Sequence, residues 1–354
     1  MISDAALLNH ALFFLVLLTT SAVVTWAMAR YVRVMDVPTA RSSHTRPTPR
    51  SGGVAIAATF LLGTVAVYVL GDEVRIADQH LAGVVTCSLA VAAVSYWDDI
   101  TQRSFVAKLT AQLLCTLAVL SFGLVVRTIY LPGVGEVSMG WAGYLFTALW
   151  MVGLTNTVNF MDGLDGLVGG VCLVAVGFLG YIAYASDSRM VYVLCYALGA
   201  GVAGFLAFNW SPAKIFMGDV GSAFLGFTLA TLAVVGASLD HGHLSFYVVP
   251  LLVLNLIFDA TVTLARRALA GERLYHAHRG HLYQLLNRMG WGHAAVATLY
   301  MSMAVAQGFA ALVLVRLPAA DRGLVVLAFL AAYALYAWLV LGAARRRGLL
   351  TRYG

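Results

Sequence analysis

Long apolar runs, separated by short polar stretches, follow one another along the chain of 354 residues. A helix that crosses a membrane needs about 20 apolar residues. Eleven runs approach that length, several of them only if their ends continue into the adjoining loops. They cover residues 7–29, 53–70, 81–96, 106–126, 141–156, 167–184, 191–208, 222–237, 246–264, 294–315 and 324–343. The pattern predicts an all-α polytopic bundle of about 11 transmembrane helices, formed by residues 1–354 as one domain; residues 125–139, with Pro132 and nearby glycines, are expected to be an irregular connector.

Hydrophobic residues make up 61% of the chain and charged residues only 11%, whereas a soluble domain carries roughly 25% charged residues. This composition indicates an integral protein of the lipid bilayer. The first apolar run has no basic stretch before it and no small-residue cleavage site, so we expect a retained helix and not a cleaved signal. The four cysteines lie inside apolar runs without metal-site spacing, which favours packing roles. The sequence contains no basic soluble module for nucleic acid.

Lysine and arginine are distributed unevenly between alternate loops. Seventeen of the 22 lie in the loops after the first, third, seventh and ninth runs and in the C-terminal tail. Because cytoplasmic loops are enriched in these residues, the N-terminus is predicted outside and the C-terminus in the cytoplasm. Every dense polar cluster falls on this cytoplasmic side, which favours an enzyme whose active site meets a cytosolic substrate. A transporter or flippase, the alternative, would place its site near the bilayer midplane.

The densest polar stretch, residues 156–170, separates two apolar runs. Asn156, Asn159, Asp162 and Asp165 follow one another at three-residue steps, which places their side chains on roughly one face if the segment is helical. Ionised groups this close to the hydrocarbon are costly unless they face water, a partner or an ion, so we interpret the stretch as functional. A capped helix end is the alternative, although a cap needs a single polar residue.

The adjacent carboxylates of Asp98 and Asp99 end the third apolar run. They repel one another, which favours a cation between them, and such a pair can bind Mg²⁺ or act as a general base. A plain helix end is the alternative, but the helix dipole disfavours negative charge there. Lys108 begins the next run and can neutralise the pair or a phosphate, while ordinary snorkelling to the interface explains it equally well.

A second motif places Asp219 at the start of a run, between Gly218 and Gly221. Asp219 can bind Mg²⁺ that bridges phosphate oxygens, and a helix N-terminus attracts anions. Phe216 can stack on a planar base, although an aromatic residue near a membrane interface is common without any such role.

Two basic loops complete the candidate chemistry. The loop before the second run holds His44 and Arg50 ahead of a glycine pair, which suits phosphate binding. A positive-inside anchor explains its charge equally well, but not its prolines and glycines. The loop after the ninth run holds three histidines, among them His278 and His281, together with Arg279. Zinc is disfavoured there because no cysteine or nearby carboxylate completes a site, so phosphate binding is the stronger interpretation.

Five motifs stand in a fixed order between residues 36 and 284. They read Pro-Arg-Ser-Gly-Gly, Asp-Asp, Asn-x-x-Asn-x-x-Asp-Gly-x-Asp-Gly-Leu, Phe-Met-Gly-Asp-x-Gly-Ser and His-Arg-x-His-x-Tyr-Gln. In this combination the chain resembles the polyprenyl-phosphate N-acetylhexosamine-1-phosphate transferases of glycosyltransferase family 4. That family includes undecaprenyl-phosphate GlcNAc-1-phosphate transferases and phospho-N-acetylmuramoyl-pentapeptide translocase. The ordered set is specific, although each motif alone is not.

The resemblance implies that the chain transfers sugar-1-phosphate from a UDP-N-acetylhexosamine to undecaprenyl phosphate and releases UMP. It implies Mg²⁺ as the cofactor, with Mn²⁺ as a substitute, and a multi-pass location in the bacterial inner membrane. It also allows a homodimer.

Residue roles follow from the resemblance together with the basic residues described above. The catalytic candidates are Asp98, Asp99, Asp162, His278 and His281. The metal candidates are Asp219 and Asp98. The substrate-binding candidates are Asn159, Asp165, Asn209, Phe216, Lys108, Arg50, His44 and Arg279.

The histidine loop departs from the family pattern. The translocase carries consecutive histidines here and the GlcNAc branch typically reads His-x-His-His, whereas this chain keeps only His278 and His281 of that pattern. This argues against a muramoyl-pentapeptide donor and leaves GlcNAc and 6-deoxy relatives such as FucNAc or QuiNAc. The loop is most similar to those of O-antigen-initiating members from Gram-negative bacteria, which implies a role in starting a lipid-linked surface polysaccharide.

Charge governs the implied reaction because two anions, the lipid phosphate and the UDP-sugar, must meet. Repulsion between unit charges about 4 Å apart is about 4 kcal/mol at an effective dielectric near 20. Mg²⁺ on Asp219, loop cations and helix N-termini are expected to offset it. Asp98 can act as a base in direct attack or as a nucleophile in two steps, and the sequence leaves both open. A CDP-alcohol phosphatidyltransferase is disfavoured, because no arginine follows Asp162 or Asp165 in the Asp-Gly-x-x-Ala-Arg order such enzymes need.

Overall fold

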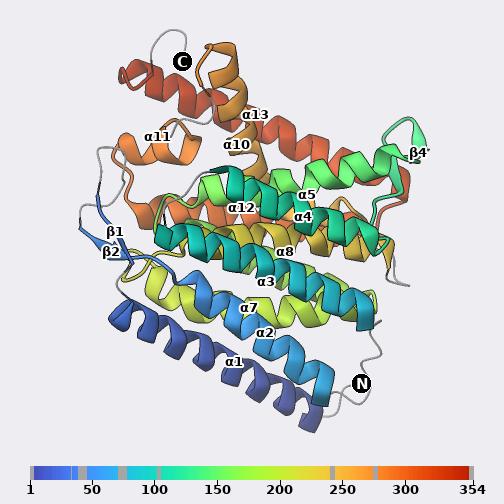
Figure 1. The fold of residues 1–354 in the computed structure, drawn as a ribbon. Helices are drawn as coiled ribbons and strands as arrows, with labels where there is room; N and C mark the ends of the chain where they lie inside the picture. The colour runs from blue at the N-terminus through green and yellow to red at the C-terminus, as the bar shows by residue number, and fades with distance from the viewer. Residues whose placement is uncertain are drawn as a thin grey trace.

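The computed structural model describes residues 4–32, 34–38, 46–70, 78–101, 105–239, 244–273 and 278–350. Most of them lie in long helices that run side by side, as Figure 1 shows. The helices are α1 (Asp4–Tyr31), α2 (Gly53–Leu70), α3 (Asp78–Thr101), α4 (Phe105–Ser121), α5 (Ala142–Met161), α6 (Leu167–Ala185), α7 (Arg189–Asn209), α8 (Gly218–Ser238), α9 (Val248–Leu252), α10 (Leu254–Leu269), α11 (Leu282–Arg288), α12 (His293–Leu314) and α13 (Arg322–Arg346). The shorter elements are β1 (Met35–Asp36), β2 (Thr48–Pro49), β3 (Thr128–Leu131), β4 (Gly135–Ser138) and the 3-10 turn η1 (Ala319–Asp321).

Eight helices of the described chain are long and apolar enough to cross a membrane, namely α1, α2, α3, α6, α7, α8, α12 and α13. The prediction of an all-α membrane protein is therefore confirmed. The count of eleven is not, because α4 is shorter and two other predicted spans fail the same test. Helix α5 carries two asparagines, and the run 246–264 is divided at Val253 into α9 and the charged helix α10. The orientation of the bundle in the membrane stays a prediction.

The motif-bearing connections lie at one end of the bundle. In Figure 1 the pair β1–β2 and helix α11 lie at the left, whereas the β3–β4 pair lies at the right. The connections between α1 and α2, α5 and α6, and α7 and α8 all reach the left end, where the backbone of residues 50–53 bonds to that of residues 216–217. Motifs separated by more than a hundred residues in sequence therefore share one surface. This was predicted from their location in loops on the same side of the membrane.

The segment predicted to be an irregular connector, residues 125–139, instead contains a hairpin. Strand β3 pairs antiparallel with β4. Gly133 and Gly135 adopt left-handed φ angles of +75° and +89°, which side-chain-bearing residues rarely adopt, and so permit the tight turn after Pro132. In the sequence, the alternation of polar and apolar residues before and after this turn was the pattern that indicated a hairpin.

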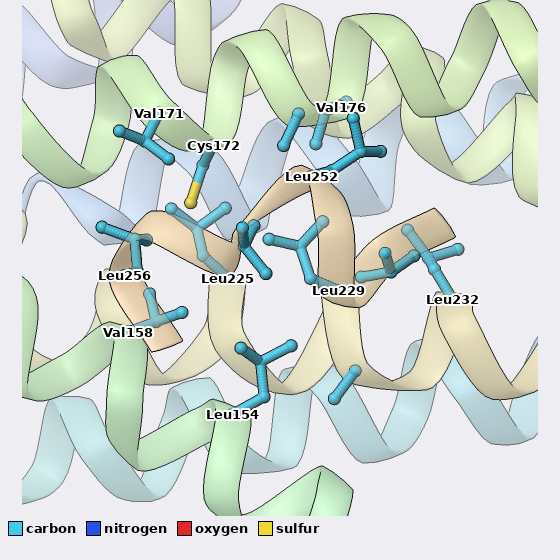
Figure 2. Close-up of a cluster of buried hydrophobic side chains, with 14 of the residues drawn as sticks. Leu154, Val158, Val171, Cys172, Val176, Leu225, Leu229, Leu232, Leu252 and Leu256 are labelled. Atoms are coloured by element: carbon cyan, nitrogen blue, oxygen red, sulfur yellow. The ribbon is translucent and has the colours of Figure 1, made fainter. Parts of the chain in front are cut away.

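Helix α8 forms the centre of the bundle and is buried along nearly its whole length. Figure 2 shows its leucines packed against side chains of α5, α6, α9 and α10. The labelled cluster comprises Leu154, Val158, Val171, Cys172, Val176, Leu225, Leu229, Leu232, Leu252 and Leu256. Cys172 is a free thiol that packs here, as predicted. In a bilayer the lipid tails are as apolar as leucine, so close packing holds such a core together more than the exclusion of water does.

The N-terminus of α2 lies directly against the N-terminus of α8. The amide of Gly53 donates to the carbonyl of Met217 at 2.8 Å. A Cβ atom on Gly53 would lie 2.2 Å from Cα of Gly221, so that a side chain there cannot be accommodated without a shift of the backbone. This contact holds the loop that carries Arg50 beside the start of α8.

We predict that Gly53→Ala lowers the stability by about 1–3 kcal/mol, the usual cost of forcing atoms into a packed site. Gly153→Ala in α5 is the matched control, because nothing lies within 4 Å of its Cβ position and alanine favours helix more than glycine does. Thermal unfolding in detergent should place Gly53→Ala below the wild type and Gly153→Ala at or above it. Equal transition temperatures for the two variants would contradict the packing argument.

Candidate active site

The ammonium group of Lys108, in α4, lies between two carboxylates from different helices. Its Nζ atom is 2.9 Å from Oδ2 of Asp98 in the last turn of α3 and 2.6 Å from Oδ2 of Asp219 in the first turn of α8. The second oxygen of Asp219 accepts a hydrogen bond of 3.1 Å from Nδ2 of Asn159 in α5. Four of the predicted residues, each from a different helix, therefore meet at one point.

Asp99 is engaged differently from its neighbour Asp98. Its carboxylate forms an ion pair with Arg50 and accepts the backbone N–H groups of Asp219 at 3.3 Å and Val220 at 3.1 Å. N–H groups in the first turn of a helix have no partner within that helix. Asp99 therefore caps α8 and fixes the place where this helix begins, while its role in catalysis stays a prediction.

Asp98 keeps one oxygen without a partner. Its side chain is only 8% exposed and Oδ2 is bound to Lys108, whereas Oδ1 is buried and accepts no hydrogen bond from the described part of the chain. An unpaired buried acceptor costs roughly 1–3 kcal/mol. This oxygen is therefore available to a proton or a cation.

A cavity of about 230 Å³ is lined by Asn159 and Asp219 of this cluster, whereas Asp98, Asp99 and Lys108 are not among its described lining residues. The predicted residues that line it are Arg50, Asn159, Asp162, Asp165, Asn209, Phe216 and Asp219. Asp36 and His293 also line it from outside the motifs, and Gln284, the last residue of the histidine motif, lines it although it was not among the predicted site residues. The cavity therefore joins the acidic, amide and basic groups from four of the five motifs.

Asp162 occupies the turn after α5 and lines the cavity. Its carboxylate has no hydrogen-bond or ion-pair partner among the described residues. Burial raises the pKa of Asp162 to about 7, the negative charges of Asp219 and Asp99 add to this rise, and Arg50 opposes it. A carboxyl group with a pKa near neutrality is suited to accept or release a proton at physiological pH.

Asp165 holds two loops together beside the cavity. Its Oδ2 accepts a hydrogen bond of 3.1 Å from the amide of Ala213 and lies 3.2 Å from Nδ1 of His293. Burial alone would raise the pKa of Asp165, but the hydrogen bonds from His293 and Ala213 outweigh burial and hold it below its ordinary value. The two acids of this motif thus differ, since Asp165 is ionised over a pH range in which Asp162 is protonated.

Asn209 uses both ends of its side-chain amide within the protein. Its Oδ1 accepts the N–H of Gly166 at 3.0 Å, and its Nδ2 donates to the carbonyl of Ile215 at 2.9 Å. The backbone of Phe216 forms a bridge with that of Arg50. Both residues therefore tie neighbouring loops together, and their predicted contacts with the nucleotide stay predictions.

The expectation of one helical face for the four polar residues of residues 156–165 is wrong. Helix α5 ends at Met161, so that Asp162 and Asp165 lie in the following turn. Asn156 lies within the helix but donates to Oε1 of Gln112 in α4 at 2.7 Å. Because three-residue steps drift around a helix with 3.6 residues per turn, Asn156 stabilises the contact between α4 and α5 and does not line the cavity.

The histidine loop contributes only Gln284 to the described cavity lining; His278, Arg279 and His281 do not line it. Nδ1 of His278 accepts the N–H of Gly280 at 3.2 Å. Burial, together with the charge of His281, lowers the pKa of His278 to about 4. His278 is therefore neutral at pH 7.

His44 lies outside the described residues. Asp259 in α10, fully buried, was not singled out, although a lone carboxylate inside an apolar run is itself a signal of function.

Comparison with known proteins gives consistent matches. The family model described as glycosyl transferase family 4 matches residues 81–237. A Bacillus subtilis protein named as a probable undecaprenyl-phosphate N-acetylglucosaminyl 1-phosphate transferase is 28% identical over 304 residues, which cover 84% of this chain and 83% of the relative. Two proteins named phospho-N-acetylmuramoyl-pentapeptide-transferase match over shorter stretches. The one from Lactiplantibacillus plantarum is 29% identical over 49% of this chain and 52% of its own length, and one from Listeria monocytogenes is 36% identical over 28% and 31%.

We predict that Asp162→Asn changes how stability depends on pH. Because the folded protein raises the pKa of Asp162 from its ordinary value to about 7, the folded state holds this proton more tightly than the unfolded chain does. The wild type therefore loses stability relative to Asp162→Asn as the pH rises from about 4 to about 7, and the difference stays constant above that.

Unfolding temperatures measured in detergent without divalent cations across this pH range would test the prediction. Asp187→Asn is the control, because Asp187 is 81% exposed at the opposite end of the bundle, and its curve should run parallel to the wild type. A parallel curve for Asp162→Asn would contradict the raised pKa.

Proposed function

We propose that the chain, whose residues 81–237 match the model of glycosyl transferase family 4, transfers N-acetylhexosamine-1-phosphate from a UDP-sugar to undecaprenyl phosphate. UMP is the second product. The reaction takes place at the cytoplasmic face of the bacterial inner membrane, and the donor sugar is GlcNAc or a 6-deoxy relative such as FucNAc or QuiNAc. The lipid product starts a surface polysaccharide such as O-antigen.

The observation that carries this proposal is the gathering of Asp98, Asp162 and Asp219 with two cations at one end of a membrane bundle. Asp98 comes from α3, Asp162 from the turn after α5, and Asp219 from α8. Arg50 forms an ion pair with Asp99, and Lys108 forms one with Asp219. A lipid phosphate and a cytosolic nucleotide can meet at such an end. A transporter or flippase has less support, because its site would be expected near the middle of the spans.

The reaction requires two anions to approach. A phosphate oxygen of the lipid attacks the β-phosphorus of the donor; the bond from that phosphorus to the bridging oxygen breaks, and UMP leaves with the electron pair. Repulsion between unit charges about 4 Å apart is about 4 kcal/mol at an effective dielectric near 20. Arg50, which lines the cavity, and Lys108 supply positive charge that offsets this repulsion in the transition state.

Proton transfer has two candidate acceptors. Asp162 is unpaired and has a pKa of about 7, which suits a base that takes the last proton of a phosphate monoester, whose second pKa is about 6. Asp98 has a buried oxygen without a partner, so it also can accept this proton or attack as a nucleophile. Asp99 is engaged by Arg50 and the start of α8, so we assign it to positioning.

Mg²⁺, or Mn²⁺ in its place, is the proposed cofactor, with Asp219 and Asp98 as its protein ligands. When bound it would supply positive charge to the donor phosphates. The fit rests on the oxygen donors that Mg²⁺ prefers and on the unpaired Oδ1 of Asp98. The described residues contain no group of three His, Cys, Asp or Glu suited to a metal. This agrees with the common use of one or two carboxylates by Mg²⁺, which completes its shell with water and substrate phosphate.

We predict that purified protein forms lipid-linked sugar diphosphate and UMP from UDP-GlcNAc or a deoxy analogue only when undecaprenyl phosphate and Mg²⁺ are both present. Asp219→Asn should lower the rate at least about 100-fold, because it removes a metal ligand, whereas Asp187→Asn should leave the rate unchanged. Exchange of labelled UMP into a panel of UDP-sugars measures both effects. Full exchange by Asp219→Asn would refute the metal assignment, and no transfer from any UDP-sugar would refute the function.

Lys108→Met tests the cation site without an activity assay. Removing the ammonium leaves Asp98 and Asp219 to repel one another, so the unfolding free energy should fall by about 3 kcal/mol. Mg²⁺ should then raise the unfolding temperature of Lys108→Met more than that of the wild type, because binding to the folded state alone stabilises it.

The double variant Lys108→Met, Asp219→Asn is the control for this experiment and should lose the extra response to Mg²⁺. Equal responses of all three proteins would show that these carboxylates do not bind the ion.

A further inference from the structure

Asp259 is a carboxylate buried in the middle of helix α10. The residue is only 1% exposed and is flanked by apolar residues of the same helix. A charged group in such surroundings is costly and persists only when specific partners compensate it. Its partners therefore indicate what it does.

Donors from two other segments, the start of α11 and helix α12, converge on Asp259. The backbone amides of Leu282 and Tyr283 donate to it at 2.8 and 3.0 Å, and the hydroxyl of Tyr300 donates at 2.5 Å. Nδ1 of His281 lies 3.2 Å from its Oδ1. Both oxygens of Asp259 already accept hydrogens from these donors, so Nδ1 of His281 is the donor in this contact and carries the hydrogen.

This contact determines the state of the His281 ring. With the hydrogen on Nδ1 directed at Asp259, Nε2 is the ring nitrogen that points away from this carboxylate. The backbone N–H of His281 is held in turn by Oε1 of Gln284 at 3.2 Å, and the ring stacks between those of His278 and Tyr283, with centroids 4.8 and 5.6 Å away. The ring therefore has one orientation and one tautomer.

The same segment is attached to the cavity. The hydroxyl of Tyr283 donates to the carbonyl of Phe160 at 3.4 Å and lies against Gly163, where a Cβ would be 2.3 Å from it. Gln284 lines the cavity itself. Asp259 thus anchors, from inside the bundle, the segment that touches the turn bearing Asp162.

We propose that Asp259 is a positioning residue for the transferase reaction. It holds His281 as the Nδ1-protonated tautomer and thereby fixes the segment 281–284, from which Tyr283 reaches the turn bearing Asp162 and Gln284 lines the cavity. The inference rests on the proposed function, and it adds a buried carboxylate–imidazole pair to the residues that the motifs identify. Asp259 itself touches no substrate.

A double-mutant cycle tests this pairing. Asp259→Asn and His281→Asn should each lower kcat by about 10- to 100-fold with little change in KM for the UDP-sugar, the usual scale for a carboxylate that orients a histidine. The double variant should be no slower than the slower single variant, because both changes remove the same unit. Effects that multiply in the double variant would overturn the proposal.

Tyr300→Phe is the matched control. It removes one hydrogen bond to Asp259 but leaves the contact with His281 in place, so kcat should fall less than in Asp259→Asn. A loss as large as that of Asp259→Asn would mean that Asp259 acts only through the general packing of α10 and α12, against the proposal. Should Asp259→Asn not yield folded protein, Asp259→Glu, which keeps the charge, replaces it in the same cycle with the same two outcomes.

Nitrogen NMR of protein labelled at histidine gives a readout that does not depend on activity. The wild type should show His281, assigned by its loss in His281→Asn, with the hydrogen on Nδ1, and Asp259→Asn should populate the Nε2-protonated form. Unchanged His281 signals in Asp259→Asn would overturn the pairing. Absence of transfer by the wild type would instead refute the proposed function, since the spectra report on the pairing alone.

Discussion

The shared ammonium group of Lys108 is the interaction on which the candidate site depends. Asp98 and Asp219 come from helices that are far apart in sequence, and their carboxylates would repel one another without the cation between them. One cation between them makes their proximity favourable and so brings α3, α4 and α8 together at one end. The same arrangement leaves Oδ1 of Asp98 unpaired, so the packing of the bundle and the reactivity of the site have a common electrostatic origin.

Much of this arrangement could be predicted from the sequence because the apolar runs and polar motifs alternate. Each of the eleven runs corresponds to helix, and their alternating direction brings the motif loops to one end. Adjacent residues, however, can diverge in three dimensions. Asp98 and Asp99 read as a pair, yet one contacts Lys108 and the other caps α8. The three-residue spacing similarly misplaces Asn156 with the site residues, because its side chain donates to Gln112 of another apolar run.

The sequence motifs did not identify features that depend on tertiary contact. Asp36 and His293 reach the cavity from segments without a motif of their own, and only the folding of the bundle makes them neighbours. The division of one predicted span into α9 and α10 turns the second part into a polar helix whose Asp259 faces donors from α11 and α12. A single carboxylate in an apolar run was the one sequence signal of this arrangement.

Two buried carboxylates perform the same physical task at different places. Asp99 accepts the N–H groups of Asp219 and Val220, and Asp259 accepts those of Leu282 and Tyr283. Each therefore satisfies two consecutive amides at a helix start, where the helix dipole also favours negative charge. These acids fix the backbone that carries the reactive groups and have no oxygen to spare for a substrate. Asp162 and Asp98, which keep an unpaired oxygen, are then the carboxylates that remain for proton transfer. Whether an acid caps a helix therefore decides whether its role is structural or chemical.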